Sequence, residues 1–257
     1  MSSNDLTPDR VYAIGDIHGH LEALRAVHAA IDEDLRENPV AGHAIVHIGD
    51  FVDRGPDMPG TLDYMVSGMA VGAPWINLMG NHDRMFLRYL EAPGGQDRIA
   101  LQRGVHWRHP KVGGYLTISA YGVPCEAGPA GPLEDGSADV ALSNALRAVV
   151  PEAHKRFLES LRSHWRWRDV FFAHAGVAPG TPLEDQIADD LIWIRGPFLE
   201  SRLDHGALIV HGHTPVERVE DHGNRIAIDT AAAYGGPLSC VVFDDDGVRI
   251  LGGERLR

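Results

Sequence analysis

The segment GDFVDRG, residues 49–55, follows a short apolar run, AIVHI, at residues 44–48. The run is typical of a buried parallel strand, and the glycines permit a tight turn at its carboxyl end. Open α/β sheets place their chemistry at that end of the strands. Asp50 is therefore expected on the floor of a crevice, with Asp53 and Arg54 on the loop just beyond it. A carboxylate there can bridge two cations, and a guanidinium can bind a phosphate through two hydrogen bonds.

Four further apolar runs end in short polar segments of the same kind. These segments are GDIHG at residues 15–19, GNHD at 80–83, HAG at 174–176 and HGHT at 211–214. A single histidine at a strand end is usually a hydrogen-bonded structural residue, but five such clusters on glycine-flanked turns are not expected by coincidence. Their carboxylate, amide and imidazole groups suit Mn, Fe, Zn or related divalent ions rather than Ca or a thiolate site.

Three successive strand–loop–helix units are predicted from the start of the chain, which implies parallel strands joined by right-handed crossovers. Strands are predicted at residues 11–14, 44–48, 75–79, 170–173, 207–210, 225–229, 238–243 and 248–251. Residues 91–137 are rich in Gly and Pro, so we expect an insertion over the site there, and one or two helices broken at Pro151 are predicted between residues 138 and 161. No internal repeat or long linker is present, and we expect a single domain over residues 1–257.

The composition narrows the functional classes. A net charge of −13 argues against binding along a nucleic-acid backbone or on an anionic membrane surface, although bound metals would let an acidic protein handle phosphorylated substrates. Cys125 and Cys240 are far apart in the sequence and are interpreted as free thiols in a reducing cytoplasm. Residues 1–10 are polar without an apolar signal segment, and no apolar run is long enough to span a bilayer. We therefore expect a soluble cytoplasmic protein.

The five motifs, in this order, resemble those of the calcineurin-like metallophosphoesterases. The GDFVDRG form is most similar to the phosphoprotein phosphatase branch and its small bacterial and phage relatives. The motifs run from Gly15 to Thr214, so the resemblance covers most of the chain. It implies an α/β fold, an α/β/β/α sandwich of mixed sheets flanked by helices, and a phosphoesterase activity that depends on two divalent metal ions.

The resemblance also implies a role for each matching position. The implied metal ligands are Asp16, His18, Asp50, Asn81, His174 and His211. Asp50 would bridge two ions, Mn2+ is the expected metal with Fe, Zn, Ni, Co or Mg as alternatives, and a bridging hydroxide would attack phosphorus. His82 would be the catalytic histidine, paired with Asp53, and Arg54 would bind phosphate oxygens. Arg195 matches a Trp-x-Arg segment of relatives, and it is either a second phosphate-binding arginine or an arginine on a helix surface.

Several neighbouring residues have open roles. Protein phosphatases usually read GNHE, whereas this chain has Asp83; the position is not a direct ligand in relatives, so the metal site is not in doubt. His213 follows His211 by two residues, and whether it supports the metal site stays open. His47 is expected as a buried, hydrogen-bonded histidine within a strand. Trp107, in the insertion, is expected to pack in the core rather than to stack on substrate.

Two enzymatic hypotheses concern the substrate. The first is a phosphomonoesterase that acts on phosphoserine or phosphothreonine in proteins and peptides, or on a small phosphoester. The second is symmetrical hydrolysis of diadenosine tetraphosphate to ADP, since the relevant bacterial hydrolases share nearly the same motifs. Those hydrolases often lack the acidic residue that is present here as Asp53, and its presence favours the phosphatase. A third hypothesis, a catalytically inactive phosphopeptide-binding module, is disfavoured by the complete ligand set. The dinucleotide is favoured by one basic cluster near Trp107, namely Arg98, Arg103, Arg108 and Lys111.

Overall fold

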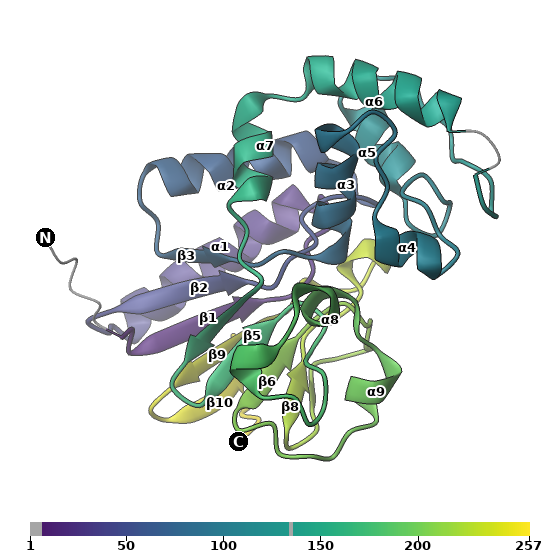
Figure 1. The fold of residues 1–257 in the computed structure, drawn as a ribbon. Coiled ribbons are helices and arrows are strands. Elements are labelled where there is room, and N and C mark those ends of the chain that lie inside the picture. The colour runs from purple at the N-terminus through teal and green to yellow at the C-terminus, as the bar shows by residue number, and fades with distance from the viewer. Residues whose placement is uncertain (1–6, 134–135) are drawn as a thin grey trace, which may run out of the picture.

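The computed structural model describes residues 7–133 and 136–257, and within them two mixed sheets face each other (Figure 1). In the first sheet, β1, β2 and β3 are parallel, and β9 joins β1 in the antiparallel sense. Because β1 and β2 pair from Arg10 opposite His43 to Ile14 opposite His47, their carboxyl ends lie level at one edge. The strand order is β10 (Gly247–Ile250), β9 (Cys240–Asp244), β1 (Arg10–Ile14), β2 (His43–His47) and β3 (Trp75–Asn77).

The second sheet is also mixed, but its edges differ from those of the first sheet. Its central strands β5, β6 and β8 are parallel, and antiparallel strands close both edges. The order is β4 (His164–Trp167), β5 (Val170–Ala173), β6 (Leu208–His211), β8 (Arg225–Ala227) and β7 (Glu220–Asp221). The predicted strands are therefore present with small shifts of their ends, whereas β4 and the two-residue β7 were not predicted.

An apolar layer joins the two sheets. Val11 and Val46 of the first sheet belong to the same buried cluster as Phe172 and Val210 of the second. Phe172 also meets Phe243 of β9 edge to face, with ring centroids 5.6 Å apart. Side chains on both faces of the central strands are buried, which explains why these strands appear in the sequence as continuous apolar runs.

Helices cover the outer faces of both sheets. The first sheet is covered by α1 (Leu21–Glu37), α2 (Met58–Ala70), α3 (Asn81–Glu91) and α7 (Glu152–Glu159), with α6 (Ser137–Val149) beyond α3 (Figure 1). On the second sheet the helical layer is thin and consists of α8 (Ala188–Trp193) and α9 (Gly196–Leu199). The four-layer α/β sandwich expected from the sequence is confirmed.

The predicted insertion is more ordered than its composition suggests. It contains α4 (Arg98–Gln102) and α5 (Gly114–Ala120), and Trp107 between them is fully buried. Residues 134–135 of the insertion, and residues 1–6 of the polar N-terminal segment, lie outside the described residues. Cys125 and Cys240 are unpaired, as expected. Among the helices described, none has the length and apolar character needed to cross a membrane.

A chain of buried polar side chains links α1 and α2 to the first sheet. His47 Nδ1 lies 2.7 Å from the Asn77 side-chain oxygen, His47 Nε2 lies 3.0 Å from His28 Nε2, and His28 Nδ1 lies 2.7 Å from the Tyr64 hydroxyl. A single assignment of protons satisfies all three bonds: Tyr64 donates to His28, His28 donates to His47, and His47 donates to Asn77. This assignment needs both imidazoles neutral, and burial lowers the pKa of His28 to about 4.

We expect this chain to make folding stability sensitive to acid. Because the pKa of His28 lies below that of an unfolded histidine, the stabilisation is complete above about pH 6.5 and is lost as the pH falls toward 4. Urea unfolding of the metal-free protein at pH 7 and pH 5 should show a fall in the free energy of unfolding that is about 2 kcal/mol larger in the wild type than in His28→Leu. Equal losses in the two proteins would contradict this role for His28.

Candidate active site

The turn after β2 has a strained backbone. Asp50, Asp53 and Arg54 adopt φ angles of 53°, 70° and 67°, in the left-handed region that non-glycine residues rarely occupy. The turn is also pressed against its neighbours, because a Cβ atom on Gly55 would lie 1.7 Å from the carbonyl oxygen of His18. Such strain persists only where the surroundings hold it, and it is common at functional sites.

The carboxylate of Asp83 holds this turn in place. It accepts hydrogen bonds from the backbone N–H groups of Asp50 and Phe51, both at 2.8 Å, and of Gly80 at 2.9 Å. Asp50 in turn accepts a hydrogen bond from the backbone N–H of His82 at 3.0 Å. Asp83 at the first turn of α3 thus joins the strand-end loops after β2 and β3, and its oxygens point at backbone amides rather than at the centre of the site.

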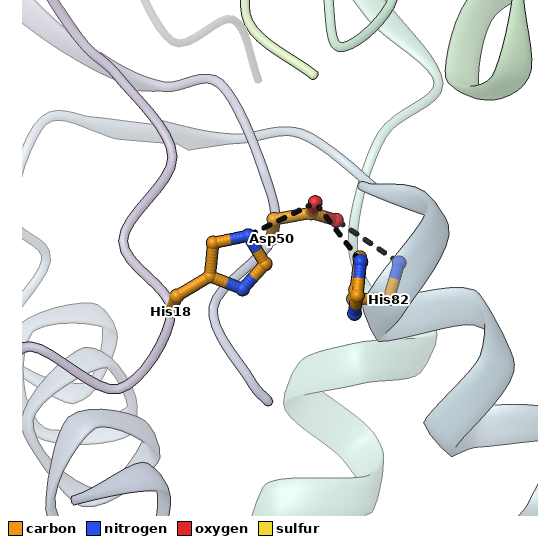
Figure 2. A group of neighbouring side chains, drawn as sticks. All are labelled: His18, Asp50 and His82. Carbon is orange, nitrogen blue, oxygen red and sulfur yellow. Dashed lines mark hydrogen bonds and ion pairs between the residues drawn. The ribbon is translucent and has the colours of Figure 1, made fainter. Parts of the chain in front are cut away.

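Asp50 lies at the centre of the polar cluster. Its Oδ2 lies 3.5 Å from His18 Nε2 and 4.0 Å from His82 Nε2 (Figure 2). The same oxygen lies 3.4 Å from His174 Nε2. Two buried groups of side chains that could hold a metal ion share this carboxylate, one with His18 and His82 and the other with His174 and His213. The shared carboxylate is the arrangement that a bridging ligand needs.

Asp16 and Asn81 border the same cluster. The carboxylate of Asp16 accepts a hydrogen bond from the backbone N–H of His213 at 3.0 Å, and the side-chain oxygen of Asn81 lies 3.1 Å from His174 Nε2. Both side chains are buried. Five of the six implied ligands are therefore brought together by loops that follow β1, β2, β3 and β5.

The electrostatics of the cluster suit cations. Burial lowers the pKa of His174, but Asp50 and Asp16 outweigh it and raise that pKa to about 9. Burial would raise the pKa of Asp50, yet His174 and His82 hold it well below its usual range. His213 Nε2 is buried and has no hydrogen-bond partner among the described residues. An acidic centre with an unpartnered imidazole nitrogen and oxygen and nitrogen donors fits divalent metal ions, which would replace the proton on His174.

His211, implied as a ligand, points away from this centre. Its ring meets Phe198 of α9 edge to face with centroids 5.0 Å apart, and its Nε2 lies 3.2 Å from an Arg225 nitrogen. His211 is the last residue of β6, and strand alternation puts it on the outer face with Ile209, opposite Val210. His213, at a φ of 63°, turns back toward the centre, with its ring 5.1 Å from that of His174. The structure thus places His213, and not the expected ligand His211, at the centre of the cluster.

His82 and Asp53 form a buried pair. His82 Nδ1 donates to Asp53 Oδ2 at 2.7 Å, which leaves His82 Nε2 facing Asp50. Burial, followed by the charge of Arg54, lowers the pKa of His82 to about 3. Burial raises the pKa of Asp53 to about 7, against the effect of hydrogen bonds from Thr117 and Trp107. The insertion, which was expected over the site, therefore reaches this pair through Trp107 and Thr117, and the sequence did not indicate these two contacts.

Two arginines border the centre. Arg54 extends a guanidinium nitrogen to 2.9 Å from His18 Nε2 and lies over the ring of Tyr234. Arg195, where α9 begins, donates to the backbone carbonyl of His213 at 3.2 Å. Both guanidinium groups thus lie next to residues of the cluster, where they can donate hydrogen bonds to an anion bound beside it.

Asp229 is a carboxylate that the ligand assignment missed. It is buried in the loop after β8 and accepts a hydrogen bond from the backbone N–H of Ala231 at 3.0 Å. The pKa of Asp16 is raised well above its usual range, first by the burial of Asp16 itself and then by the charge of Asp229. A signal was available, because Asp229 directly follows the apolar residues Ile226 to Ile228, as the other strand-end carboxylates follow theirs.

Carboxylates, imidazoles and an amide at the carboxyl ends of strands from two facing mixed sheets are groups that could hold divalent metal ions. The family model described as calcineurin-like phosphoesterase matches residues 9–243, and the chain belongs to this family. It is therefore a phosphoester hydrolase.

Individual relatives differ in their described activities. The chain is 25% identical over 241 residues to serine/threonine-protein phosphatase 1 of Salmonella typhimurium, with 89% of each chain covered. It shares its fold with a "putative diadenosine tetraphosphatase" (TM-score 0.60, 20% identity, 96% of this chain and 94% of the other). It also shares its fold with a cold-active protein tyrosine phosphatase (TM-score 0.60, 20% identity, 94% of this chain and 75% of the other).

We expect the two neighbouring histidines to differ in their effect on metal content. After Mn2+ loading and desalting, elemental analysis should show that His213→Ala weakens retention of one ion by about 10-fold or more, because an imidazole ligand is lost. His211→Ala is the matched control and should keep the metal content of the wild type. The opposite pattern would restore His211 as the ligand.

Proposed function

We propose that this phosphoester hydrolase is a serine/threonine protein phosphatase that uses two divalent metal ions. The observation that carries the proposal is the buried His82–Asp53 hydrogen bond of 2.7 Å, directed at the Asp50 cluster. An acid held beside the reacting centre is of most use when the leaving oxygen belongs to an alkyl alcohol, which is a poor leaving group without protonation. Phosphoserine and phosphothreonine have such leaving groups.

The proposed metal ligands follow from the cluster. Asp16, His18 and Asp50 would hold one ion, and Asp50, Asn81, His174 and His213 would hold the other, with Mn2+ as the expected metal. When bound, the ions supply an activated water and offset charge on the phosphoryl oxygens. The chain itself would bind the remaining oxygens through Arg54 and Arg195, whose guanidinium groups form paired hydrogen bonds with phosphate.

His82 would then act as the general acid. A phosphoryl dianion bound next to Nε2 favours the protonated imidazole, since an opposite charge nearby raises the pKa. With Nδ1–H donated to Asp53, Nε2–H is left to protonate the leaving oxygen. Asp53 fixes the ring orientation and stabilises the imidazolium, so the pair works as one unit.

Three of the four basic residues that favoured a dinucleotide have partners within the protein. Arg108 is buried and makes two hydrogen bonds to Asp139, at 2.8 and 2.9 Å. Arg98 pairs with Asp189, and Arg103 donates to the carbonyl of Trp193. Trp107 is fully buried, so it offers no face for a nucleobase. These contacts support a phosphopeptide over diadenosine tetraphosphate as the substrate.

The two unpaired cysteines support a reducing compartment, and a cytoplasmic location is part of the proposal. The net charge of −13 supports a function without nucleic acid.

We expect His82→Asn to lower kcat by about 10²- to 10⁴-fold, the usual loss when a general acid is removed. Its metal content should stay close to that of the wild type, because Nδ1 is bonded to Asp53 and the proposed ligand set is complete without His82. Metal analysis and turnover of a phosphoserine peptide test both points, with His154→Asn as a buried histidine control outside the site. Loss of a metal ion from His82→Asn would make His82 a ligand and not the acid.

We also expect kcat/KM for a phosphoserine or phosphothreonine peptide to exceed that for diadenosine tetraphosphate. Both constants are measured with Mn2+ at one pH and ionic strength, with a phosphotyrosine peptide as a third substrate. The physical reason is that a single phosphoryl group needs only the Asp50 cluster and two arginines. Release of ADP with the larger constant would overturn the substrate assignment and leave the metal site unaffected.

A further inference from the structure

Two side chains of the insertion bind the carboxylate of Asp53. The Thr117 hydroxyl of α5 donates to Oδ1 at 2.5 Å and accepts from the backbone N–H of Asp53 at 3.1 Å. The Trp107 indole N–H donates to Oδ2 at 2.9 Å. All three side chains are fully buried. Since Oδ2 also accepts from His82, Asp53 receives three side-chain hydrogen bonds, two of them from a segment more than fifty residues away in the chain.

The insertion is itself anchored, so these donors are held in place. The Trp107 indole stacks on Phe86 with ring centroids 5.2 Å apart, and it contacts Tyr89 at 4.8 Å. A Cβ atom on Gly114 would lie 2.5 Å from the indole, so α5 lies directly against the ring. The Gln96 side chain also accepts from the backbone N–H of Trp107 at 3.0 Å. A rigid indole with its N–H aimed at Oδ2 leaves the carboxylate little rotational freedom.

We propose that Thr117 and Trp107 are positioning residues for proton transfer, so that the insertion adapts the site to substrates with poor leaving groups. This inference rests on the proposed function. In the step concerned, the bond from phosphorus to the alkyl oxygen breaks, and that oxygen keeps the electron pair and takes the Nε2 proton of His82. The attacking water gives its oxygen and one hydrogen to phosphorus. The other proton of the water is released to solvent. His82, which gave its Nε2 proton to the alkyl oxygen, takes one proton back from solvent, so the protons balance.

The hydrogen bonds to Asp53 act on this step through the direction of His82. Without them the carboxylate can rotate about its side-chain bonds, and the imidazole bonded to it loses its fixed direction toward the leaving oxygen. A misplacement of this kind lowers the rate of protonation while leaving substrate binding at the arginines intact. It matters for a serine alkoxide and much less for nitrophenolate, which is a stable anion that leaves without a proton.

The test compares leaving groups in two variants. Thr117→Val removes the hydroxyl at nearly constant shape, and Trp107→Phe removes the indole N–H while keeping an aromatic ring against Phe86. We expect each to lower kcat for a phosphoserine peptide by about 10-fold or more, with KM little changed, and to lower kcat for p-nitrophenyl phosphate by less than about 2-fold. Thr117→Ser, which restores the hydroxyl, should recover most of the loss.

Tyr121→Phe is the matched control. It removes the hydrogen bond from Tyr121 to His154 just after α5, which does not involve Asp53, and should leave the ratio of the two activities unchanged. Equal losses on both substrates in Thr117→Val and Trp107→Phe, or no rescue by Thr117→Ser, would overturn the inference. A wild-type protein that hydrolyses p-nitrophenyl phosphate but no phosphoserine or phosphothreonine peptide would instead overturn the proposed function. If either variant is unfolded, as judged by its melting temperature, the ratio of the two activities in the other variant and in Thr117→Ser still tests the inference.

Discussion

The site depends on one carboxylate whose hydrogen-bond donors, among the described residues, are backbone N–H groups. Asp83 accepts three amide hydrogen bonds and thereby joins the loop after β2 to the loop after β3. The turn that it holds carries left-handed φ angles at Asp50, Asp53 and Arg54, which cost free energy in isolation. Removing the acceptor would leave three buried N–H groups unpaired, at roughly 1–3 kcal/mol each. The position of Asp50, and with it the whole cluster, follows from this anchor.

Burying several carboxylates in one cluster is electrostatically unfavourable, and a bound cation would offset this cost. Burial raises the pKa of Asp16, as do the charges of Asp229 and Asp50, and burial and the charge of Asp50 raise the pKa of Asp229. Buried carboxylates are tolerated only when they are paired. In the chain alone, part of that pairing comes from a proton on His174, whose pKa is raised to about 9. Metal ions offer the same compensation with more charge, so binding and local stability are coupled.

Much of the architecture could be predicted because its signals are local. Each central strand is a short apolar run, and each run is followed directly by the polar residues that the strand delivers to the sheet edge, as at Ile14 to Asp16 and at Ile48 to Asp50. Burial on both faces makes such runs continuous, and parallel strands bring their carboxyl ends to one place. By contrast β4, with the sequence HWRW, is an edge strand with alternating exposure, and its short pattern was too weak to identify.

The sequence by itself determined the positions of the central strands, the strand-end motifs and the combination of residue types that suits divalent metals, whereas two facing sheets were expected only from the resemblance of the motifs to a known family. The tertiary structure decided which of His211 and His213 faces the centre, because a left-handed turn after β6 reverses the direction that alternation along a strand predicts. It also decided the roles of the insertion. Arg108 is neutralised by Asp139, and Trp107 and Thr117 bind Asp53, through contacts between residues far apart in the chain. Hydrogen-bond partners at such separations are set by packing, which no local pattern records.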